Sequence, residues 1–278
     1  MREDFSQRTA HRIWHRVQGE GVPVLFIMGF GMRGQVWERQ VASLMSDHEC
    51  VYFDHAGLGN SGPISTRRLT MATMADDALG ILDTLGWETA HVVGISMGGM
   101  IAQHLAVRAH ARLRSLTLAA TTPGGFPHVV PPLRGLRLFA KANGARGAEA
   151  VNALAELLFS PEFIRREPDL AMELLREDFS GQQPPRETRL AHLHAVTHHN
   201  IASRLEVLRR VPTMIIKPTQ DVLVSPKQCD RLHRLIPHSV LHEIPAGHGV
   251  TRERPRRLTR VESHRGCRAV LDNRGETV

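Results

Sequence analysis

The sequence predicts an α/β fold in which a mostly parallel central sheet is flanked by helices and carries a helical insertion. Three observations lead to this prediction. Short apolar runs alternate with longer segments of helical periodicity, as in parallel sheets built from crossover connections. Between residues 131 and 208 only helical patterns occur. One strand-to-helix turn holds a serine between two glycines, in the pattern Gly94-x-Ser96-x-Gly98.

The first part of the chain alternates expected strands with expected helices. Residues 23–28 form an uninterrupted apolar run, which is typical of a strand buried on both faces of a parallel sheet. Residues 70–85 carry apolar side chains at helical spacing and are followed by Gly86, a residue that commonly ends helices. By the same reasoning we expect strands at 11–18, 23–28, 50–53, 91–95 and 113–119, and helices around 37–44 and over 70–85 and 100–109.

The second part of the chain begins with a block of helical patterns. These patterns cover residues 133–142, 148–159, 161–179 and 186–205, with prolines at 168, 184 and 185 as interruptions. The strand and helix order then returns, with a strand at 212–216, a helix at 226–235 and a strand at 239–244. An all-helical block inside an α/β chain predicts a cap over an active site. We therefore expect a core of residues 1–122 and 211–278 and a helical cap of residues 123–210.

The composition favours a globular chain without membrane spans or disulfides. No apolar run reaches the length that a membrane-spanning helix needs. The N-terminus has mixed charge and no apolar segment behind it, so we expect no signal peptide. The three cysteines, Cys50, Cys229 and Cys267, are odd in number and widely separated. Free thiols in a reducing cytoplasm explain them better than a disulfide framework or a zinc site.

The formal net charge of +7 raises the question of nucleic-acid binding. Residues 250–278 contain eight arginines against four acidic residues, so over half of the positive excess lies in the C-terminal tail. Elsewhere the charges are mixed, and the sequence contains neither a basic stripe with interleaved aromatic residues nor a nucleic-acid module signature. We therefore interpret the basic tail as a solvated segment and expect no nucleic-acid partner.

The turn around Ser96 has the layout of a nucleophile elbow. A serine at a sharp strand-to-helix turn exposes its hydroxyl above the sheet, and the flanking glycines let the strand and the helix approach closely. The amide after the serine lies at a helix N-terminus, where an unpaired N–H and the positive end of the helix dipole can hold an oxyanion. An incidental serine in a glycine-rich turn is the alternative, and the clear strand and helix patterns on either side disfavour it.

A serine nucleophile needs a base, and the base needs a carboxylate that fixes its tautomer. Asp221 lies in a short loop after the strand expected at 212–216, and His248 lies between two glycines after the last expected strand. The chain order Ser96, Asp221, His248 is the order found in enzymes with this elbow. Residues 120–122, the other place where such an acid can lie, contain no acidic side chain.

These motifs resemble the α/β-hydrolase superfamily over most of the chain, from residue 23 to about residue 249, and in particular its bacterial esterase-like members with a helical cap. The resemblance implies an α/β-hydrolase fold. It also implies that Ser96 is the nucleophile, that His248 acts as general base and then as general acid, and that Asp221 orients His248.

The resemblance further implies an oxyanion hole formed by the backbone amides of Phe30 and Met97, and we expect both residues to line the acyl site because these amides must face it. Two family positions differ in this chain. Met28 stands where the family has a histidine that braces the oxyanion loop, and Ala56 replaces the arginine of the family's Asp-x-Arg-Gly motif. Both changes affect loop structure rather than the reacting groups. The arginine-rich residues 256–268 depart from the amphipathic helix expected at this end of the chain.

Histidines and glycines suggest two other kinds of site. Four histidines lie close together in the expected cap: His192, His194, His198 and His199. They lack an H-E-x-x-H frame, so pocket lining or a solvated face is favoured over metal binding. We interpret His55 as part of the loop structure. The glycines at 57, 59 and 62 lack the following Lys-Ser/Thr of a phosphate-binding loop.

The expected function is hydrolysis of a carboxylic ester, lactone or thioester through an acyl-Ser96 intermediate, without a metal or organic cofactor. Alternatives on the same scaffold are a perhydrolase, a C–C bond-cleaving enzyme, and a catalyst of cyclisation or elimination. A ligand-binding protein without turnover is disfavoured, because a receptor has no chemical need for all three candidate catalytic residues. Five apolar residues of the expected cap favour a lipophilic acyl substrate: Leu136, Phe139, Leu157, Phe159 and Leu174.

Overall fold

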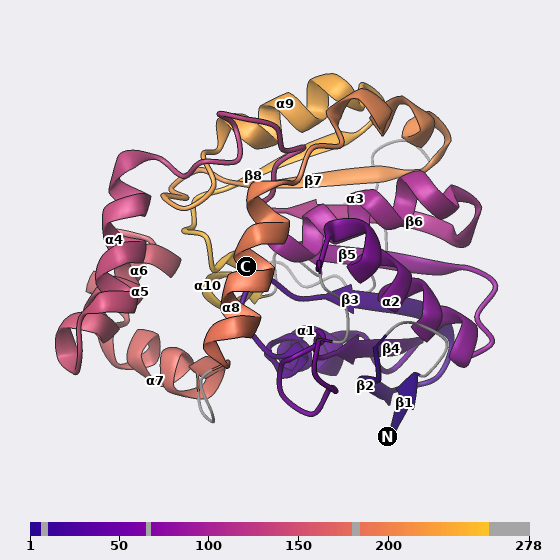
Figure 1. The fold of residues 1–278 in the computed structure, drawn as a ribbon, viewed down its shortest axis with the longest axis horizontal. Helices are drawn as coiled ribbons and strands as arrows, with labels where there is room; N and C mark the ends of the chain where they lie inside the picture. The colour runs from indigo at the N-terminus through magenta and orange to yellow at the C-terminus, as the bar shows by residue number, and fades with distance from the viewer. Residues whose placement is uncertain (7–10, 65–67, 180–183, 256–278) are drawn as a thin grey trace, which may run out of the picture.

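The computed structural model describes residues 1–6, 11–64, 68–179 and 184–255, and within these residues the strands form one eight-stranded sheet (Figure 1). The strand order is β1-β2-β4-β3-β5-β6-β7-β8. The pairs β1–β2 and β2–β4 are antiparallel, and the other pairs are parallel. The strands are β1 (Arg2–Ser6), β2 (Ile13–Gln18), β3 (Val22–Ile27), β4 (His48–Phe53), β5 (Ala90–Ile95), β6 (Leu113–Ala119), β7 (Thr213–Pro218) and β8 (Val240–Ile244). The predicted mostly parallel sheet is confirmed.

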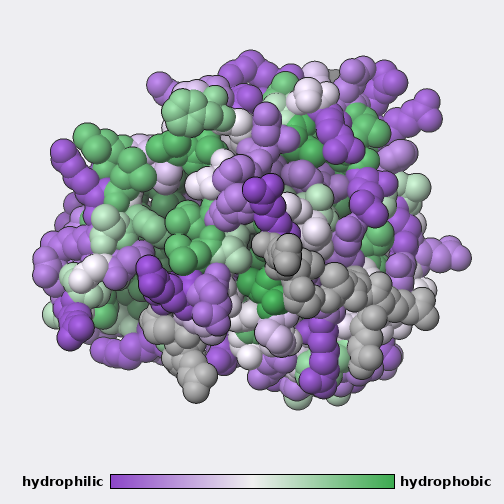
Figure 2. Space-filling model, in the orientation of Figure 1, coloured by the Kyte–Doolittle hydropathy of each residue, from purple (hydrophilic) through white to green (hydrophobic). Residues whose placement is uncertain are grey.

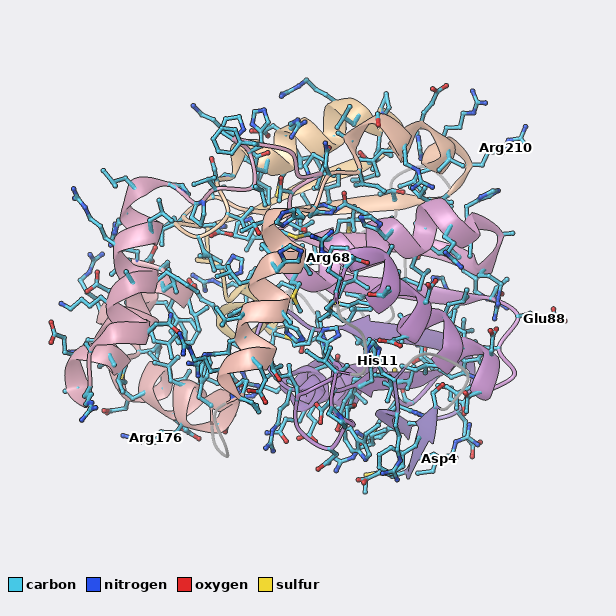
Figure 3. The ribbon with its side chains drawn as sticks, in the orientation of Figure 1. Asp4, His11, Arg68, Glu88, Arg176 and Arg210 are labelled. Atoms are coloured by element: carbon cyan, nitrogen blue, oxygen red, sulfur yellow. The ribbon has the colours of Figure 1, made fainter. Side chains whose placement is uncertain are left out.

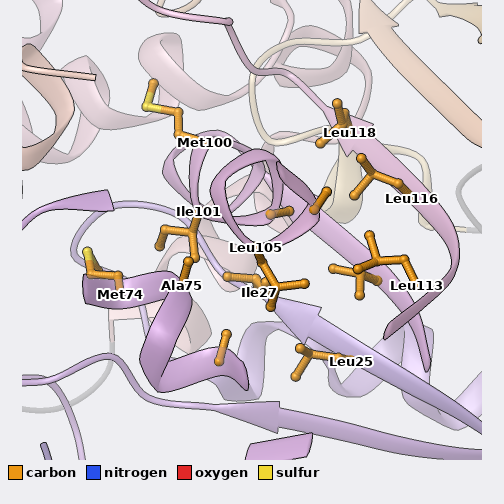
Figure 4. Close-up of a cluster of buried hydrophobic side chains, with 14 of the residues drawn as sticks. Leu25, Ile27, Met74, Ala75, Met100, Ile101, Leu105, Leu113, Leu116 and Leu118 are labelled. Carbon is orange, nitrogen blue, oxygen red and sulfur yellow. The ribbon is translucent and has the colours of Figure 1, made fainter. Parts of the chain in front are cut away.

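Helices cover both faces of this sheet, and the side chains of β3 alternate between them. Leu25 and Ile27 pack into the larger hydrophobic cluster, whereas Val24 and Phe26 pack into the cluster on the opposite face. Figure 4 shows part of the larger cluster, where residues of α2 and α3 meet residues of β3 and β6. The larger cluster is formed with α2 (Met71–Thr84), α3 (Met97–Ala109), η3 (Ala202–Arg210) and α9 (Lys227–Leu235), and α8 (Arg186–Thr197) adds Ala195. Those of the other are η1 (Gly34–Trp37), α1 (Glu38–Leu44) and α10 (Val250–Glu253), and the short η2 (His110–Arg112) links α3 to β6.

A set of helices between β6 and η3, which we call the insert, lies beside the sheet (Figure 1). The insert consists of α4 (Leu133–Gly144), α5 (Ala148–Leu158), α6 (Pro161–Arg166), α7 (Pro168–Phe179) and α8 (Arg186–Thr197). It has a small hydrophobic cluster of its own, in which side chains of α5, α6 and α7 pack together. The predicted predominance of helix in this part of the chain therefore matches the observed elements.

Three local predictions differ from the structure. Strand β1 escaped prediction because its sequence is mostly charged and its exposed residues pair at the sheet edge. The helical pattern at 161–179 is two helices, since Pro168 lacks an N–H and disfavours helical backbone in the residue before it. The pattern at 186–205 was predicted too long, because α8 ends at Thr197 and Asn200 then forms a bridge with Gly124.

The surface combines scattered charges with a local gathering of apolar side chains. Arg176, Arg210 and Glu88 project from the periphery (Figure 3). Figure 2 shows hydrophobic side chains gathered where α4 and α8 lie, and the exposed leucines of these helices are Leu133, Leu136, Leu190 and Leu193. Among the helices of the described residues, none has the length and apolar character required to cross a bilayer. The arginine-rich residues 256–268 and Cys267 lie outside the described residues.

Candidate active site

Ser96 occupies a strained position between β5 and α3. Its φ of 54° and ψ of −120° lie in a region that side-chain-bearing residues rarely adopt. The strain is held by three hydrogen bonds: the Ser96 amide donates to Ala119 O at 2.9 Å, and the Ser96 carbonyl accepts from Met100 N at 3.1 Å and from Thr121 Oγ1 at 2.8 Å. The hydrogen bonds therefore fix the serine at the junction where the strand turns into the helix.

The two glycines of the elbow are required by close backbone contacts. A Cβ atom on Gly98 would lie 2.1 Å from the carbonyl oxygen of Ile27, and one on Gly94 would lie 2.5 Å from the carbonyl oxygen of Gly98. Neither glycine has a positive φ, so contact rather than backbone conformation excludes a side chain here. The short approach of α3 to β3 and β5 follows from these two residues.

His248 and Asp221 form a buried pair at the ends of β8 and β7. His248 Nδ1 lies 2.7 Å from Asp221 Oδ2, and the two residues are only 6% and 5% exposed. The other carboxylate oxygen, Oδ1, accepts from the amides of Leu223 and Val224, each at 2.8 Å. Because an ionised carboxylate only accepts hydrogen bonds, the proton belongs on Nδ1 and Nε2 is left as the basic nitrogen.

The residues expected to form an oxyanion hole lie on both sides of Ser96. The loop of Gly29 and Phe30 is adjacent to the serine, since a Cβ atom on Gly29 would lie 3.4 Å from Ser96 Cβ. Within the described residues the Phe30 amide has no hydrogen-bond acceptor. Met97 is the first residue of α3, a position whose amide has no partner inside the helix.

A cavity of about 340 Å³ brings the predicted residues to one place. Ser96, His248 and Phe30 line it, whereas Asp221 lies behind His248 and does not. Met97 is not among the residues that line the cavity, because its side chain is 1% exposed and packs in the core. At the start of a helix the amide N–H points out of the N-terminal end, whereas the side chain of this residue packs into the core cluster.

The apolar wall of the cavity is supplied by the insert. Of the five apolar residues predicted to face the substrate, Phe139, Leu157 and Phe159 line the cavity. The prediction is wrong for the other two. Leu136 is 40% exposed on the outside of α4, and Leu174 is fully buried in the cluster that α5, α6 and α7 form with one another.

Comparison with known proteins places this geometry in a family. A family model described as the alpha/beta hydrolase fold matches residues 22–255, which is most of the chain. The chain belongs to the α/β-hydrolase family. Ser96, Asp221 and His248 all lie inside the matched region, together with the whole insert.

Three relatives illustrate the range of this match. A protein of Azorhizobium caulinodans named "Putative carbamate hydrolase RutD" is 31% identical over 239 residues, covering 84% of this chain and 87% of that protein. The 3-oxoadipate enol-lactonase 1 of Acinetobacter baylyi is 26% identical, with 86% of each chain covered. The structure of a thermophilic esterase from Thermogutta terrifontis superposes with a TM-score of 0.75 at 26% identity, covering 93% of this chain and 95% of that one.

In this member of the α/β-hydrolase family, His55 contacts the loop at Met28, where the resemblance leads one to expect a histidine. His55 Nε2 lies 2.8 Å from the carbonyl oxygen of Met28, the residue that replaces that histidine. His192 of α8 lies 3.2 Å by its Nε2 from Ala56 O and packs edge-on against both His55 and Phe30. Burial, and for His55 also the neighbouring His192, lowers the pKa of His55 to about 3, and burial lowers that of His192 to about 4. Both rings are therefore neutral donors to backbone carbonyls.

The remaining histidines of the insert serve structural contacts. His199 is buried, and its Nε2 lies 3.0 Å from Thr122 O while its Nδ1 lies 3.3 Å from His104. The rings of His194 and His198 stack with centroids 3.9 Å apart on an exposed turn. Within the described part of the chain, no group of three or more histidine, cysteine, aspartate or glutamate side chains has a metal-binding arrangement.

Two features of the site escaped the sequence analysis. Glu253 is buried and accepts hydrogen bonds from the amides of Gly247 and Ser160, so it connects the His248 loop to the insert. Its only sequence signal is its place shortly after His248, at the start of a charged stretch. Three arginines, described below, also line the cavity, and their spacing in the sequence gave no indication of it.

Proposed function

We propose that this chain is a serine hydrolase that cleaves a carboxylic ester, lactone or thioester through an acyl-Ser96 intermediate. One observation carries the proposal: Ser96, in its strained conformation, lines the same cavity as His248, whose Nδ1 is held by Asp221. A nucleophile, a base and an orienting carboxylate are the three groups that acyl transfer requires.

In the first half-reaction, His248 Nε2 takes the hydroxyl proton of Ser96 while Oγ attacks the acyl carbon. The amides of Phe30 and Met97 donate hydrogen bonds to the oxyanion that forms. When the intermediate collapses, the bond from the acyl carbon to the leaving oxygen or sulfur breaks, and His248 returns its proton to that leaving atom. Asp221 stays ionised and stabilises the imidazolium.

In the second half-reaction, water takes the place of the departed alcohol or thiol. His248 removes a proton from the water as its oxygen attacks the acyl-serine carbonyl. The bond from the acyl carbon to Ser96 Oγ then breaks, and His248 protonates Oγ while the carboxylic acid leaves. The names of the relatives, a putative carbamate hydrolase, an enol-lactonase and an esterase, support hydrolysis of a carbonyl derivative and leave its class open.

We propose in addition that the insert belongs to a cap of residues 123–210 over the reacting groups, because its residues Phe139 and Leu157 line the same cavity as Ser96. The C-terminal part of this cap packs into the larger core cluster through Ala195, Leu205 and Leu208.

The proposal requires neither a metal nor a reactive thiol. Cys50 and Cys229 are free and buried, and burial raises the pKa of each to about 12, which leaves them as unreactive thiols at neutral pH. A reducing cytoplasmic compartment, as predicted from the cysteine pattern, remains part of the proposal.

Hydrolysis of a p-nitrophenyl ester series from acetate to laurate tests the proposed function. The wild type should hydrolyse at least part of the series, and Ser96→Ala should remove that activity. Mass spectrometry after treatment with a serine-directed phosphonate should find the adduct on Ser96. An adduct without ester turnover would favour the perhydrolase, C–C bond-cleaving or cyclisation alternatives. If no adduct forms and no ester is hydrolysed, acyl-serine catalysis is overturned and a binding protein is favoured.

A further inference from the structure

The cavity around Ser96 has a cationic wall as well as an apolar one. The apolar wall comes from α4, α5 and the residues after α5. Three arginines also line the cavity: Arg33, Arg189 and Arg252. Among the described lining residues these are opposed by a single carboxylate, that of Asp178. A cavity built only for a lipophilic acyl chain has no use for three guanidinium groups.

The charge of Arg252 is already balanced. Its Nε lies 3.1 Å from Asp178 Oδ2, and its Nη2 lies 2.7 Å from Asp178 Oδ1. The same Nη2 lies 2.5 Å from Glu177, which Arg39 also approaches at 3.4 Å. Two arginines and two carboxylates therefore form one compact neutral group at the edge of the cavity.

Arg33 and Arg189 have no such balance. Within the described residues neither makes an ion pair, and Arg189 Nη1 donates only to the carbonyl oxygen of Pro184, at 3.2 Å. Burial raises the pKa of Asp54, and the nearby charge of Arg33 acts against this shift. Its carboxylate oxygens are engaged instead by the amides of Gly34, at 2.8 Å, and Asn60, at 3.0 Å.

The two unbalanced arginines border the same stretch of wall. Through Asp54, the segment of Arg33 and Gly34 is tied to the loop that contains residues 57–59, and this loop also lines the cavity. The loop in turn touches the start of α8, since a Cβ atom on Gly57 would lie 2.6 Å from Thr188 Oγ1. Arg189 follows directly in the chain. Arg33 and Arg189 thus flank one short loop, and both face the cavity.

We propose that the substrate carries a carboxylate, which Arg33 and Arg189 bind, while its apolar part lies against α4 and α5. A partly buried guanidinium beside apolar surface is incompletely solvated, so an unpaired charge there is unfavourable. A bound anion stabilises it through charge-assisted hydrogen bonds. The planar guanidinium fork matches a carboxylate better than it matches a neutral oxygen. This inference rests on the proposed function, because it places the carboxylate on the acyl compound that Ser96 attacks.

The test compares two activated esters with acyl chains of equal length, p-nitrophenyl hexanoate and mono-p-nitrophenyl adipate. Each kcat/KM is divided by the rate of spontaneous hydrolysis of the same ester, which removes intrinsic reactivity. The wild type should prefer the adipate ester by at least about tenfold, the size of one charged hydrogen bond. High salt should reduce the preference by screening the ion pairs. Arg33→Gln and Arg189→Gln should each reduce it, mainly through KM, and the double variant should abolish it.

Arg166→Gln is the matched control, since this arginine is 72% exposed on α6 and should leave the preference unchanged. Equal normalised rates for both esters in the wild type, with both removed by Ser96→Ala, would overturn the anion site and leave the proposed function standing. If neither ester is hydrolysed, calorimetry on Ser96→Ala with monomethyl adipate and dimethyl adipate decides. If only monomethyl adipate binds, and Arg189→Gln weakens its binding, the anion site is supported even without turnover. If both adipate esters bind equally, or neither binds, the anion site is overturned.

Discussion

At the scale of single residues, the two oxygens of Asp221 have different partners. One oxygen accepts a hydrogen bond from the imidazole N–H of His248, and the other accepts hydrogen bonds from two backbone amides of the following turn. The carboxylate is thereby fixed in rotation before any substrate binds. Since only a full carboxylate can accept at both oxygens, the tautomer of His248 depends on the charge of this side chain.

Asp221→Asn should therefore separate structure from chemistry. The asparagine oxygen can keep the two amides, which turns its NH₂ group toward His248 Nδ1 and forces the proton onto Nε2. We expect kcat for ester hydrolysis to fall on the order of a thousand- to ten-thousand-fold, as for the wrong tautomer in other triads. Circular dichroism and thermal unfolding should change little. A kcat within tenfold of wild type, with Asp169→Asn on α7 as the exposed control, would contradict this role.

The chemistry-bearing residues are the part of the site that sequence could predict. Ser96, Asp221 and His248 follow strand ends in a fixed order, and strand ends of a parallel sheet meet at one edge. The direction of a side chain was less predictable, as Met97 illustrates, because helix phase at the first turn depends on how α3 docks. The guanidinium groups of Arg33 and Arg189 could not be predicted, since only tertiary contacts bring them to one wall.

At the scale of elements, the short helix α10 ties the His248 loop to the insert. Glu253 Oε2 accepts from Gly247 N at 2.9 Å and from Ser160 N at 3.0 Å, and its Oε1 accepts from Ser160 Oγ at 2.5 Å. In addition, Gly249 N donates to the carbonyl oxygen of Leu158 at 2.6 Å. The position of His248, the proposed general base, is thus set partly by residues more than eighty positions earlier in the chain.

Glu253→Gln and Glu253→Ala remove different numbers of these hydrogen bonds, so together they measure how much the connection contributes to catalysis. Glutamine keeps one acceptor oxygen for the two amides and loses the bond from the Ser160 hydroxyl proton, whereas alanine loses all three bonds. We expect kcat to fall on the order of tenfold for glutamine and a hundredfold for alanine, with KM less affected, because a displaced base slows the chemical step. Urea unfolding should show a loss of about 1–3 kcal/mol for alanine.

Glu167→Gln, an exposed change in the insert, is the control for this pair. If the Glu253 variants lose stability but keep the kcat and KM of the wild type, Glu253 is a packing residue without influence on His248.

The helices and strands themselves were largely predictable, because alternation and helical spacing follow from burial. Strand β1 and the end of α8 were not, since the first depends on edge pairing and the second on the bridge between Asn200 and Gly124.

At the scale of the whole molecule, the interior holds several neutral histidines. His55, His192 and His199 are at most 2% exposed, and burial lowers their pKa to about 3, 4 and 3 respectively. In the unfolded chain each would titrate near 6.5. Between that pH and about 4 the unfolded state binds more protons than the folded state, so the free energy of unfolding falls as the pH falls.

We therefore expect the free energy of unfolding to fall strongly already at mildly acidic pH. At about pH 5 each of the three histidines favours the unfolded state by about 2 kcal/mol, a total of about 6 kcal/mol. Asp178 acts in the opposite sense, because burial raises its pKa to about 6 and its folded form takes up a proton first, but it offsets only about 1–2 kcal/mol. Together these four groups give a loss of roughly 4–5 kcal/mol, a large share of a typical folding free energy.

Urea unfolding at several pH values between neutrality and about pH 5 measures this dependence. His192→Gln, whose amide can still donate to Ala56 O, should flatten the profile by about 2 kcal/mol at its acid end. His110→Gln, on the exposed surface of η2, should not. A free energy of unfolding that stays constant over this range would show that the buried rings take up protons without unfolding.

The seating of the insert on the two catalytic loops has a consequence for sequence change and redesign. Gly135 of α4 lies so close to the acid loop that a Cβ atom would be 2.0 Å from Val222 O, and a Cβ atom on Gly247 would be 2.6 Å from Leu158 O. A larger residue at either glycine would have to displace the loop of Asp221 or the loop of His248. Phe139, Leu154 and Leu157 of the insert line the cavity. Substrate range can therefore be altered through these three positions while the reacting groups stay in register, so related chains of different specificity should vary there and keep glycine at 135 and 247.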